Sequence, residues 1–288
     1  MKTLPTSEYP IYTILIPSLK RECRFRPLIV KEEKALMIAQ AEENNKLMLE
    51  TLRSVIGSCL METDVDVDEL SLFDCEYLLV KLRAISIGEE VTVMLKCSDP
   101  HEGHEQSRLF GVACNLNNVK VIGLENYNPN VKINDNLMVH MVAPTIDSML
   151  FASEETEDIS EYEKNFRLVA SLIKEIITKD EVIDCSEFSV DEMCEWLEGL
   201  PADGYEKILN FFNNLPRVVI QVEWDCPYCG KHNVRLLSGL SVFFWFVSLP
   251  TILKITTTQT LHYMSIIIGQ LQTSKRWFPM RGKSTKPW

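Results

Sequence analysis

The chain has 288 residues, of which 46% are hydrophobic, and a formal net charge of −12 with a pI near 5.0. This hydrophobic content is sufficient for a packed core and excludes a disordered chain. The acidic balance argues against a general nucleic-acid-binding surface, which needs a basic face. The length suggests one large domain or two modest ones.

The charges are unevenly distributed along the chain. No Asp or Glu follows Asp225, whereas eight Lys and Arg residues do. The nine cysteines are scattered and form no disulfide framework. Pro5, Glu8 and Pro10 interrupt the stretch where a signal peptide would need an apolar core, so we expect a cytosolic protein with reduced thiols.

Residues 1–29 are predicted as an extended arm with a strand at 11–16. Pro17 and Pro27 each disfavour helix in the residue that precedes them. Between these prolines lies a basic cluster of four side chains, namely Lys20, Arg21, Arg24 and Arg26. Taken alone, the segment favours an arm docked on its own domain over one that pairs with another subunit.

The rest of the chain predicts an α+β fold built of four further units. Residues 30–88 form a helical unit, with one helix at 31–62 that is broken near 43–46 and a second at 69–84 that ends at Gly88. Residues 89–145 form a small antiparallel β unit with strands near 91–96, 109–114, 119–124 and 137–142. Residues 146–216 form a second helical unit, and residues 217–244 form a strand–knuckle–strand pair.

Two patterns define the second helical unit. One is an apolar stripe at helical spacing, formed by Tyr162, Phe166, Val169, Ile173 and Ile177. The other is a capping box, Ser189 and Glu192, which starts a helix that runs through residue 197. A last helix is expected at 205–215.

The motif Cys226-Pro-Tyr-Cys229-Gly at the end of a strand is the most specific local signal. A CPxCG turn is typical of zinc knuckles, in which two thiolates hold one metal ion. Cys97 and His101 are the candidates for the remaining ligands, with His104, Cys114 and His232 as alternatives. A metal-free turn with buried thiols is an equal alternative. A redox CxxC is disfavoured because the sequence that follows is strand-like.

Catalytic motifs are mostly absent, with no GxSxG, GxGxxG or GxxxxGK[ST] sequence. A hydrolase that uses His101 and His104 in their acidic loop is an alternative, although such a loop is more often a solvated connector. The apolar run at 236–253 is interrupted by Ser, Gly and Pro residues and is too short for a transmembrane helix. We therefore expect no membrane span.

Three blocks resemble a baseplate hub family of T-even-like contractile-tailed bacteriophages. They are IPS…RFRP…VKEEK in residues 16–34, KLRAISIGE with the strand that leads to Cys97, and DCPYCGKH with LSGLSVFF in residues 225–244. The resemblance implies a non-enzymatic structural or assembly protein of the baseplate hub. Its partners would be other hub or tail proteins or copies of itself, in the virion tail baseplate or in the host cytoplasm during assembly. Partner contact would fall on the arm, at Lys20, Arg21, Arg24, Arg26 and Pro27.

Two alternatives remain beside this interpretation. The chain could act as a transient baseplate assembly chaperone that is not retained in the virion. It could also be a zinc-ribbon adaptor unrelated to phage.

Residues 245–288 depart from the pattern of the resembled family, whose tail is acidic and carries YYxTNF and PxERxIY blocks. The coding frame can be shifted so that the third base of each codon joins the first two bases of the next codon. With codons that the present sequence permits, this shifted frame encodes both blocks and restores the acidic residues. We therefore hypothesise that the chain from about Trp245 onward is an out-of-frame product, and expect this tail to be poorly ordered or loosely packed. The nucleotide sequence decides this hypothesis.

Overall fold

The computed structural model describes residues 8–42, 44–97, 110–154, 159–239 and 253–254. Within these residues the α+β class is confirmed, because helices alternate with four small sheets. The helices are α1 (Val30–Ala41), α2 (Asn45–Cys59), α3 (Leu72–Ile87), α4 (Ile146–Glu154), α5 (Glu161–Ser171), α6 (Val190–Glu198) and α7 (Ala202–Asn213). The strands are β1 (Tyr12–Ile16), β2 (Arg21–Phe25), β3 (Glu90–Leu95), β4 (Phe110–Asn115), β5 (Lys120–Ile122), β6 (Asn130–Asn134), β7 (Leu137–Met141), β8 (Ile173–Thr178), β9 (Val182–Asp184), β10 (Arg217–Asp225), β11 (His232–Ser238) and β12 (Leu253–Lys254).

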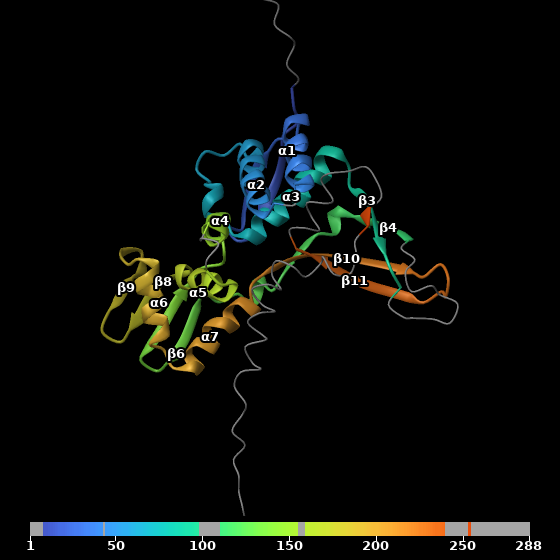
Figure 1. Cartoon of the computed structure of the whole chain (residues 1–288). Coiled ribbons are helices and arrows are strands. Elements are labelled where there is room, and N and C mark those ends of the chain that lie inside the picture. Colours follow the sequence, from blue (N-terminus) through green and yellow to red (C-terminus); the bar gives the residue numbers. More distant parts are fainter. Residues whose placement is uncertain (1–7, 43, 98–109, 155–158, 240–252, 255–288) are drawn as a thin grey trace, which may run out of the picture.

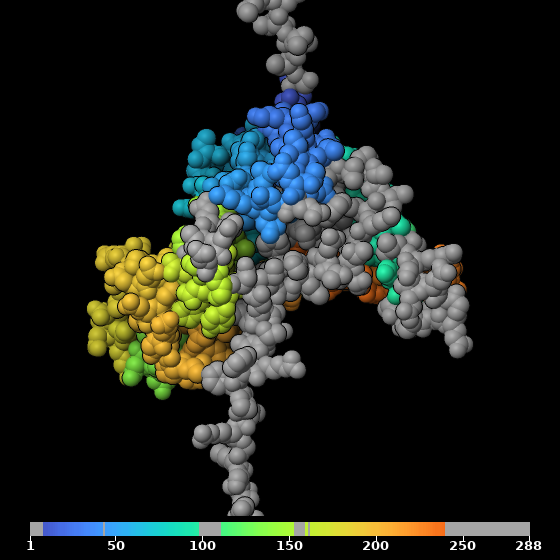
Figure 2. Space-filling view, viewed as in Figure 1, coloured from blue at the N-terminus to red at the C-terminus, as the bar shows by residue number. Residues whose placement is uncertain are grey.

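The strands are grouped in four sheets with the orders β1-β2, β11-β10-β5, β12-β3-β4 and β6-β7-β8-β9. All pairings are antiparallel except that of β12 with β3, which is parallel. Figure 1 shows α1, α2 and α3 together, with α5, α6 and α7 on one side of them and the β10–β11 hairpin projecting on the other. The space-filling view in Figure 2 shows the helical body in blue and, beside it, the lobe in green, yellow and orange.

The segment expected as an extended arm contains a β-hairpin that packs on its own chain. Strands β1 and β2 pair in register, and Ile16 and Phe25 are fully buried against the N-terminal helices. The turn between the strands is held by Asp74 of α3, whose carboxylate accepts a hydrogen bond from the N–H of Ser18 at 2.9 Å. Because the exposed strand face is charged, the alternation of buried Cys23 and Phe25 in β2 is hard to see in the sequence.

The predicted break in the first long helix is confirmed. Helix α1 ends at Ala41 and α2 begins at Asn45. Asn44 caps α2, since its side-chain oxygen accepts a hydrogen bond from the N–H of Leu47 at 3.1 Å. The predicted stop at Gly88 is also confirmed, because this glycine follows α3 with a φ of 135°, a value that side chains rarely allow.

The strands expected within residues 89–145 belong to three different sheets. Strands β3 and β4 pair with each other, whereas β5 pairs with β10 and begins a separate sheet. Strands β6 and β7 share a four-stranded sheet with β8 and β9, which lie within the segment that was expected to be helical. These pairings join residues that are far apart in the sequence, so hydrophobic periodicity does not reveal them.

The prediction of one helical stripe from Tyr162 to Ile177 is wrong. Helix α5 ends at Ser171, and Ile173 begins strand β8, which pairs with β7. The residues of β8 are rich in β-branched side chains, which favour a strand. Its isoleucines, at 173, 176 and 177, also fit the spacing of a helix, so this short segment is ambiguous in the sequence. The capping box that starts α6 is confirmed, with the Ser189 N–H donating to Glu192 at 2.8 Å.

The C-terminal strand pair is confirmed for the described residues. Strands β10 and β11 pair antiparallel from Val219 and Ser238 to Asp225 and His232. One face of this hairpin is buried, through Val218, Ile220, Val222 and Leu237. Of the tail beyond residue 244, the structure describes only Leu253 and Lys254, which form β12 on the edge of β3, so the expectation for the rest of residues 245–288 lies outside the described residues.

No helix in the described part of the chain has the length and apolar content to cross a membrane. The apolar run at 236–253 falls mostly outside the described residues.

Candidate metal centre

Three cysteine thiols from two distant segments meet at the far end of the β10–β11 hairpin. Cys97 follows strand β3, whereas Cys226 and Cys229 lie in the turn between β10 and β11. The three Sγ atoms all lie within 4.8 Å of one another, and those of Cys97 and Cys229 are 3.9 Å apart. The structure thus brings together three of the four ligands predicted from the sequence.

The turn that carries two of these thiols is closed by its own backbone. The N–H of Cys226 donates to the carbonyl of Lys231 at 2.8 Å, and the N–H of Gly230 donates to the carbonyl of Cys226 at 2.8 Å. Gly230 has a φ of 69°, in the left-handed region that favours glycine. The chain therefore reverses within the CPxCG motif and places both thiols on the side that faces Cys97.

The two thiols of the turn have different proton affinities. Burial tends to raise the pKa of Cys226, but hydrogen bonds from the backbone N–H groups of Tyr228 and Cys229 outweigh it and hold this pKa below its ordinary value. Burial, together with the neighbouring thiols, raises the pKa of Cys229. The thiolate is the form of cysteine that binds metal ions, and the lowered pKa favours this form at Cys226.

The other predicted ligands are placed as follows. His101 and His104 lie outside the described residues. Cys114 is buried in β4, where burial raises its pKa to about 11, and it is not part of the thiol cluster. Nδ1 of His232 forms a hydrogen bond of 2.9 Å with Oδ1 of Asp225.

Sequence reasoning did not single out Asn233, although it borders the cluster. Its side chain is 4% exposed, and its Oδ1 lies 3.7 Å from Sγ of Cys97. Its Nδ2 donates to the carbonyl of Lys231 at 2.8 Å, which links β11 to the turn. No signal in the sequence indicates it, because apolar Val234 and Leu236 alternate with Asn233 along β11 and yet are the exposed residues.

The basic cluster of the hairpin is largely neutralised within the chain. Arg21 donates to both carboxylate oxygens of Asp64, at 2.8 and 3.0 Å. The three arginine pairs are Arg21 with Asp64, Arg24 with Glu62, and Arg26 with Glu32. Lys20 forms no ion pair with any described residue and adopts a φ of 50°. Partner binding by this cluster stays a prediction, and Lys20 is the charge most available for it.

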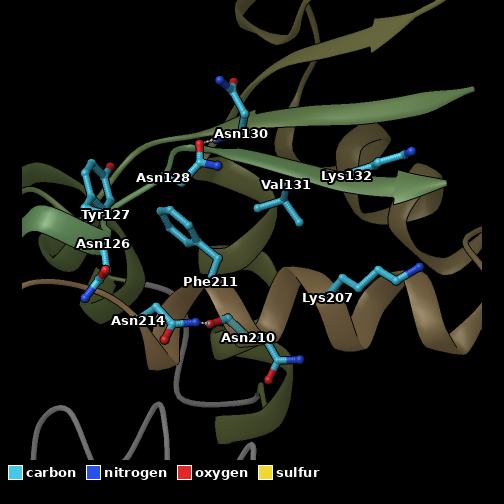
Figure 3. Close-up of a pocket in the computed structure, with 10 residues that line it drawn as sticks. All are labelled: Asn126, Tyr127, Asn128, Asn130, Val131, Lys132, Lys207, Asn210, Phe211 and Asn214. Carbon is cyan, nitrogen blue, oxygen red and sulfur yellow. Dashed lines mark hydrogen bonds between the residues drawn. The ribbon is translucent and has the colours of Figure 1, made fainter. Parts of the chain in front are cut away.

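A pocket of about 310 Å³ lies between α7 and β6 (Figure 3). Figure 3 shows a lining rich in amide side chains around Phe211, formed by Asn126, Asn128, Asn130, Asn210 and Asn214. Two lysines complete its rim, but Lys132 pairs with Asp135 at 2.7 Å and Lys207 donates to the carbonyl of Ile133 at 2.6 Å. Both lysines of this pocket are thus engaged with the chain itself.

A larger pocket of about 660 Å³ lies where α3, α4 and β8 approach one another. Its described lining includes Phe73, Phe151 and Tyr127 together with several hydroxyl groups and three acidic side chains, but no His or Cys. Nearby, Arg53 of α2 bridges Asp68 and Asp147, which fastens α4 to the N-terminal helices.

The described residues form small sheets, a thiol cluster and a hairpin whose arginines pair within the chain. Comparison with known families identifies the class of protein. The family described as T4 bacteriophage base plate protein matches residues 9–245. Because this match covers most of the sequence, the chain belongs to that family. No curated protein and no solved structure matches it.

Family membership gives the protein a structural or assembly role in the baseplate of T4-like phage tails. It places the protein at the virion tail baseplate, in contact with other phage tail proteins.

Proposed function

We propose that this protein is a subunit of the baseplate hub that acts through protein–protein contacts and carries out no catalysis. The observation that carries the proposal is the family match over residues 9–245, which includes the hairpin, the helical body and the β10–β11 turn. The resemblance of residues 16–34 and 225–244 to hub proteins supports the finer assignment to the hub.

The N-terminal hairpin provides a surface suited to such contacts. Large apolar side chains around β1 are exposed by 36–55%, namely Tyr9, Ile11, Tyr12, Leu15 and Leu19. Val30, at the start of α1, is 78% exposed. Exposed apolar residues gathered in one segment are typical of a surface that another protein covers. Lys20, which forms no ion pair with a described residue, lies in the same segment, and its charge would favour an acidic neighbour.

The test is complementation of a phage that lacks the gene, with tails purified and examined by electron microscopy and mass spectrometry. We expect tails without complete baseplates in the absence of the protein, and the protein in purified virions when it is supplied. The double variant Leu15→Glu, Leu19→Glu should abolish baseplate completion. Val182→Glu, at a residue 62% exposed on β9, is the matched control and should complement fully.

The alternative of a transient assembly chaperone predicts a different outcome in the same experiment. Baseplates would still require the protein, but no peptide of it would be found in purified virions. A zinc-ribbon adaptor unrelated to phage does not agree with the family membership. Baseplates that assemble normally without the protein would refute the proposed role altogether.

A further inference from the structure

We propose that Cys97, Cys226 and Cys229 bind one zinc ion, which clamps the end of β3 to the β10–β11 turn. The inference concerns the internal construction of the protein and is independent of the proposed hub function. It names a metal site that joins two sheets, the β12-β3-β4 sheet and the β11-β10-β5 sheet.

The spacing of the thiols matches tetrahedral zinc. With zinc–sulfur bonds of about 2.3 Å, two sulfur ligands of a tetrahedral ion lie about 3.8 Å apart. The Sγ atoms of Cys97 and Cys229 are separated by 3.9 Å, and all three Sγ atoms lie within 4.8 Å. A disulfide requires sulfur atoms at about 2.05 Å, so the cluster has the dimensions of a metal site.

Packing explains the other cysteines but not this group. Six cysteines outside the cluster are buried and behave as small apolar side chains, as Cys23, Cys59 and Cys75 do in the N-terminal core. Cys229 is exposed and Cys97 is only partly buried, yet the two thiols approach each other across 132 residues of sequence. A role in filling the core does not account for a thiol at the surface.

The backbone of the turn is built for a metal ligand pair. Two N–H groups close the turn onto the carbonyls of Lys231 and Cys226, and Gly230 supplies the left-handed residue that the reversal needs. Asn233, which is buried, holds the Lys231 carbonyl and faces Cys97. Ligands spaced as Cys-x2-Cys with a supporting amide beside them are typical of structural zinc sites.

A clamp at this place has a mechanical consequence. The β10–β11 hairpin projects from the helical body (Figure 1), and the thiol cluster lies at its far end. Zinc bound there would tie the tip of the hairpin to the strand beside it. The described residues supply three ligand positions, which leaves the fourth to water or to a donor from outside them.

The first experiment measures zinc in the full-length protein, purified with a reductant and without chelator. We expect one zinc ion per chain by mass spectrometry of the metal, and its loss in Cys97→Ser and Cys229→Ser. Cys194→Ser, at a buried cysteine of α6 outside the cluster, is the matched control and should keep the ion. Equal zinc content in the wild type and in Cys229→Ser would overturn the proposal.

The second experiment uses only the wild-type chain, so it does not depend on the folding of a variant. Cobalt exchanged for zinc should give the near-ultraviolet absorption of thiolate ligation, and a chelator should remove it. Removal should also speed hydrogen exchange in β11 and leave α6 unchanged. Failure to bind cobalt, or a disulfide between Cys97 and Cys229 in the freshly purified protein, would refute the zinc clamp.

Discussion

Replacement of Arg26 by alanine tests whether the basic hairpin is fastened to its own helices. Nη2 of Arg26 donates to Oε1 of Glu32 at 2.8 Å, and the Glu32 side chain is only 6% exposed. Without the guanidinium, this carboxylate keeps backbone donors, among them the N–H of Ile29 at 2.9 Å.

The magnitude follows from the burial of the pair. A hydrogen bond to a charged group contributes about 1.5–3 kcal/mol, and breaking a fully buried ion pair costs about 3–5 kcal/mol. Because the Arg26 side chain is 21% exposed, solvent screens part of the loss. We therefore expect Arg26→Ala to lower the free energy of unfolding by about 2–3 kcal/mol.

Urea unfolding followed by circular dichroism measures this difference, with Arg24→Ala as the control. Arg24 forms a similar pair with Glu62, but its side chain is 59% exposed. A surface pair of this kind contributes about 0–1 kcal/mol. Equal losses for the two variants would refute the argument that burial makes the Arg26 pair the stronger one.

The same pair predicts a pH dependence. Burial tends to raise the pKa of Glu32, but the hydrogen bonds from Arg26 and from the N–H of Ile29 outweigh it and hold this pKa below its ordinary value. Since the folded state binds the proton less tightly than the unfolded one, this stabilisation is complete above the unfolded pKa of about 4.3 and is lost as the pH falls through the folded pKa. The difference between wild type and Arg26→Ala should therefore be full at neutral pH and shrink below about pH 4. A gap that stayed constant down to pH 2 would contradict this.

Two further substitutions test packing and capping, each by urea unfolding. A Cβ added at Gly204 of α7 would lie 2.8 Å from Cγ2 of buried Ile133, so Gly204→Ala should cost about 1–2 kcal/mol by overpacking. Gly57→Ala is its control: the nearest atom lies 3.9 Å away, and the change should stabilise α2 by about 0.5–1 kcal/mol. Ser189→Ala removes the oxygen that accepts the N–H of Glu192 and should cost about 1 kcal/mol, with faster hydrogen exchange confined to the first turn of α6. A stabilised Gly204→Ala, or a neutral Ser189→Ala, would show that these contacts are weaker than their geometry indicates.

The sequence predicted those parts of the fold that depend on neighbours in the chain. The break before α2, the glycine after α3 and the capping box of α6 are local devices, and the structure has all three. The thiol cluster was predicted in part because the CPxCG turn is also local. Cys97 was one of several candidates to meet it, because it also follows a strand, and the structure brings its thiol to the turn.

The remaining features depend on pairing across long distances and could not be derived from periodicity. Strand β2 cannot be recognised from the sequence, because its exposed side chains Arg21 and Arg24 resemble a basic cluster. Their acidic partners lie in the segment after α2. Strand β8 continues the apolar spacing of α5, so the two elements read as one helix until the pairing with β7 is known. The basic cluster looked like a free surface charge for the same reason, since its acidic partners are remote in sequence.

The pairing of β5 with β10 has a consequence for how this protein is put together. Ile122 and Arg217 are cross-strand partners, so the chain leaves the sheet for the lobe of residues 123–216 and returns to it at the same point. That lobe contains its own four-stranded sheet with α5, α6 and α7. Apart from this neck, it is braced against the body through Arg53 and Asp147, and through the N–H of Leu72, which donates to the carbonyl of Pro144 at 2.8 Å. The lobe is thus a topological insertion between two paired strands, and a tight turn from Ile122 to Arg217 would join β5 directly to β10.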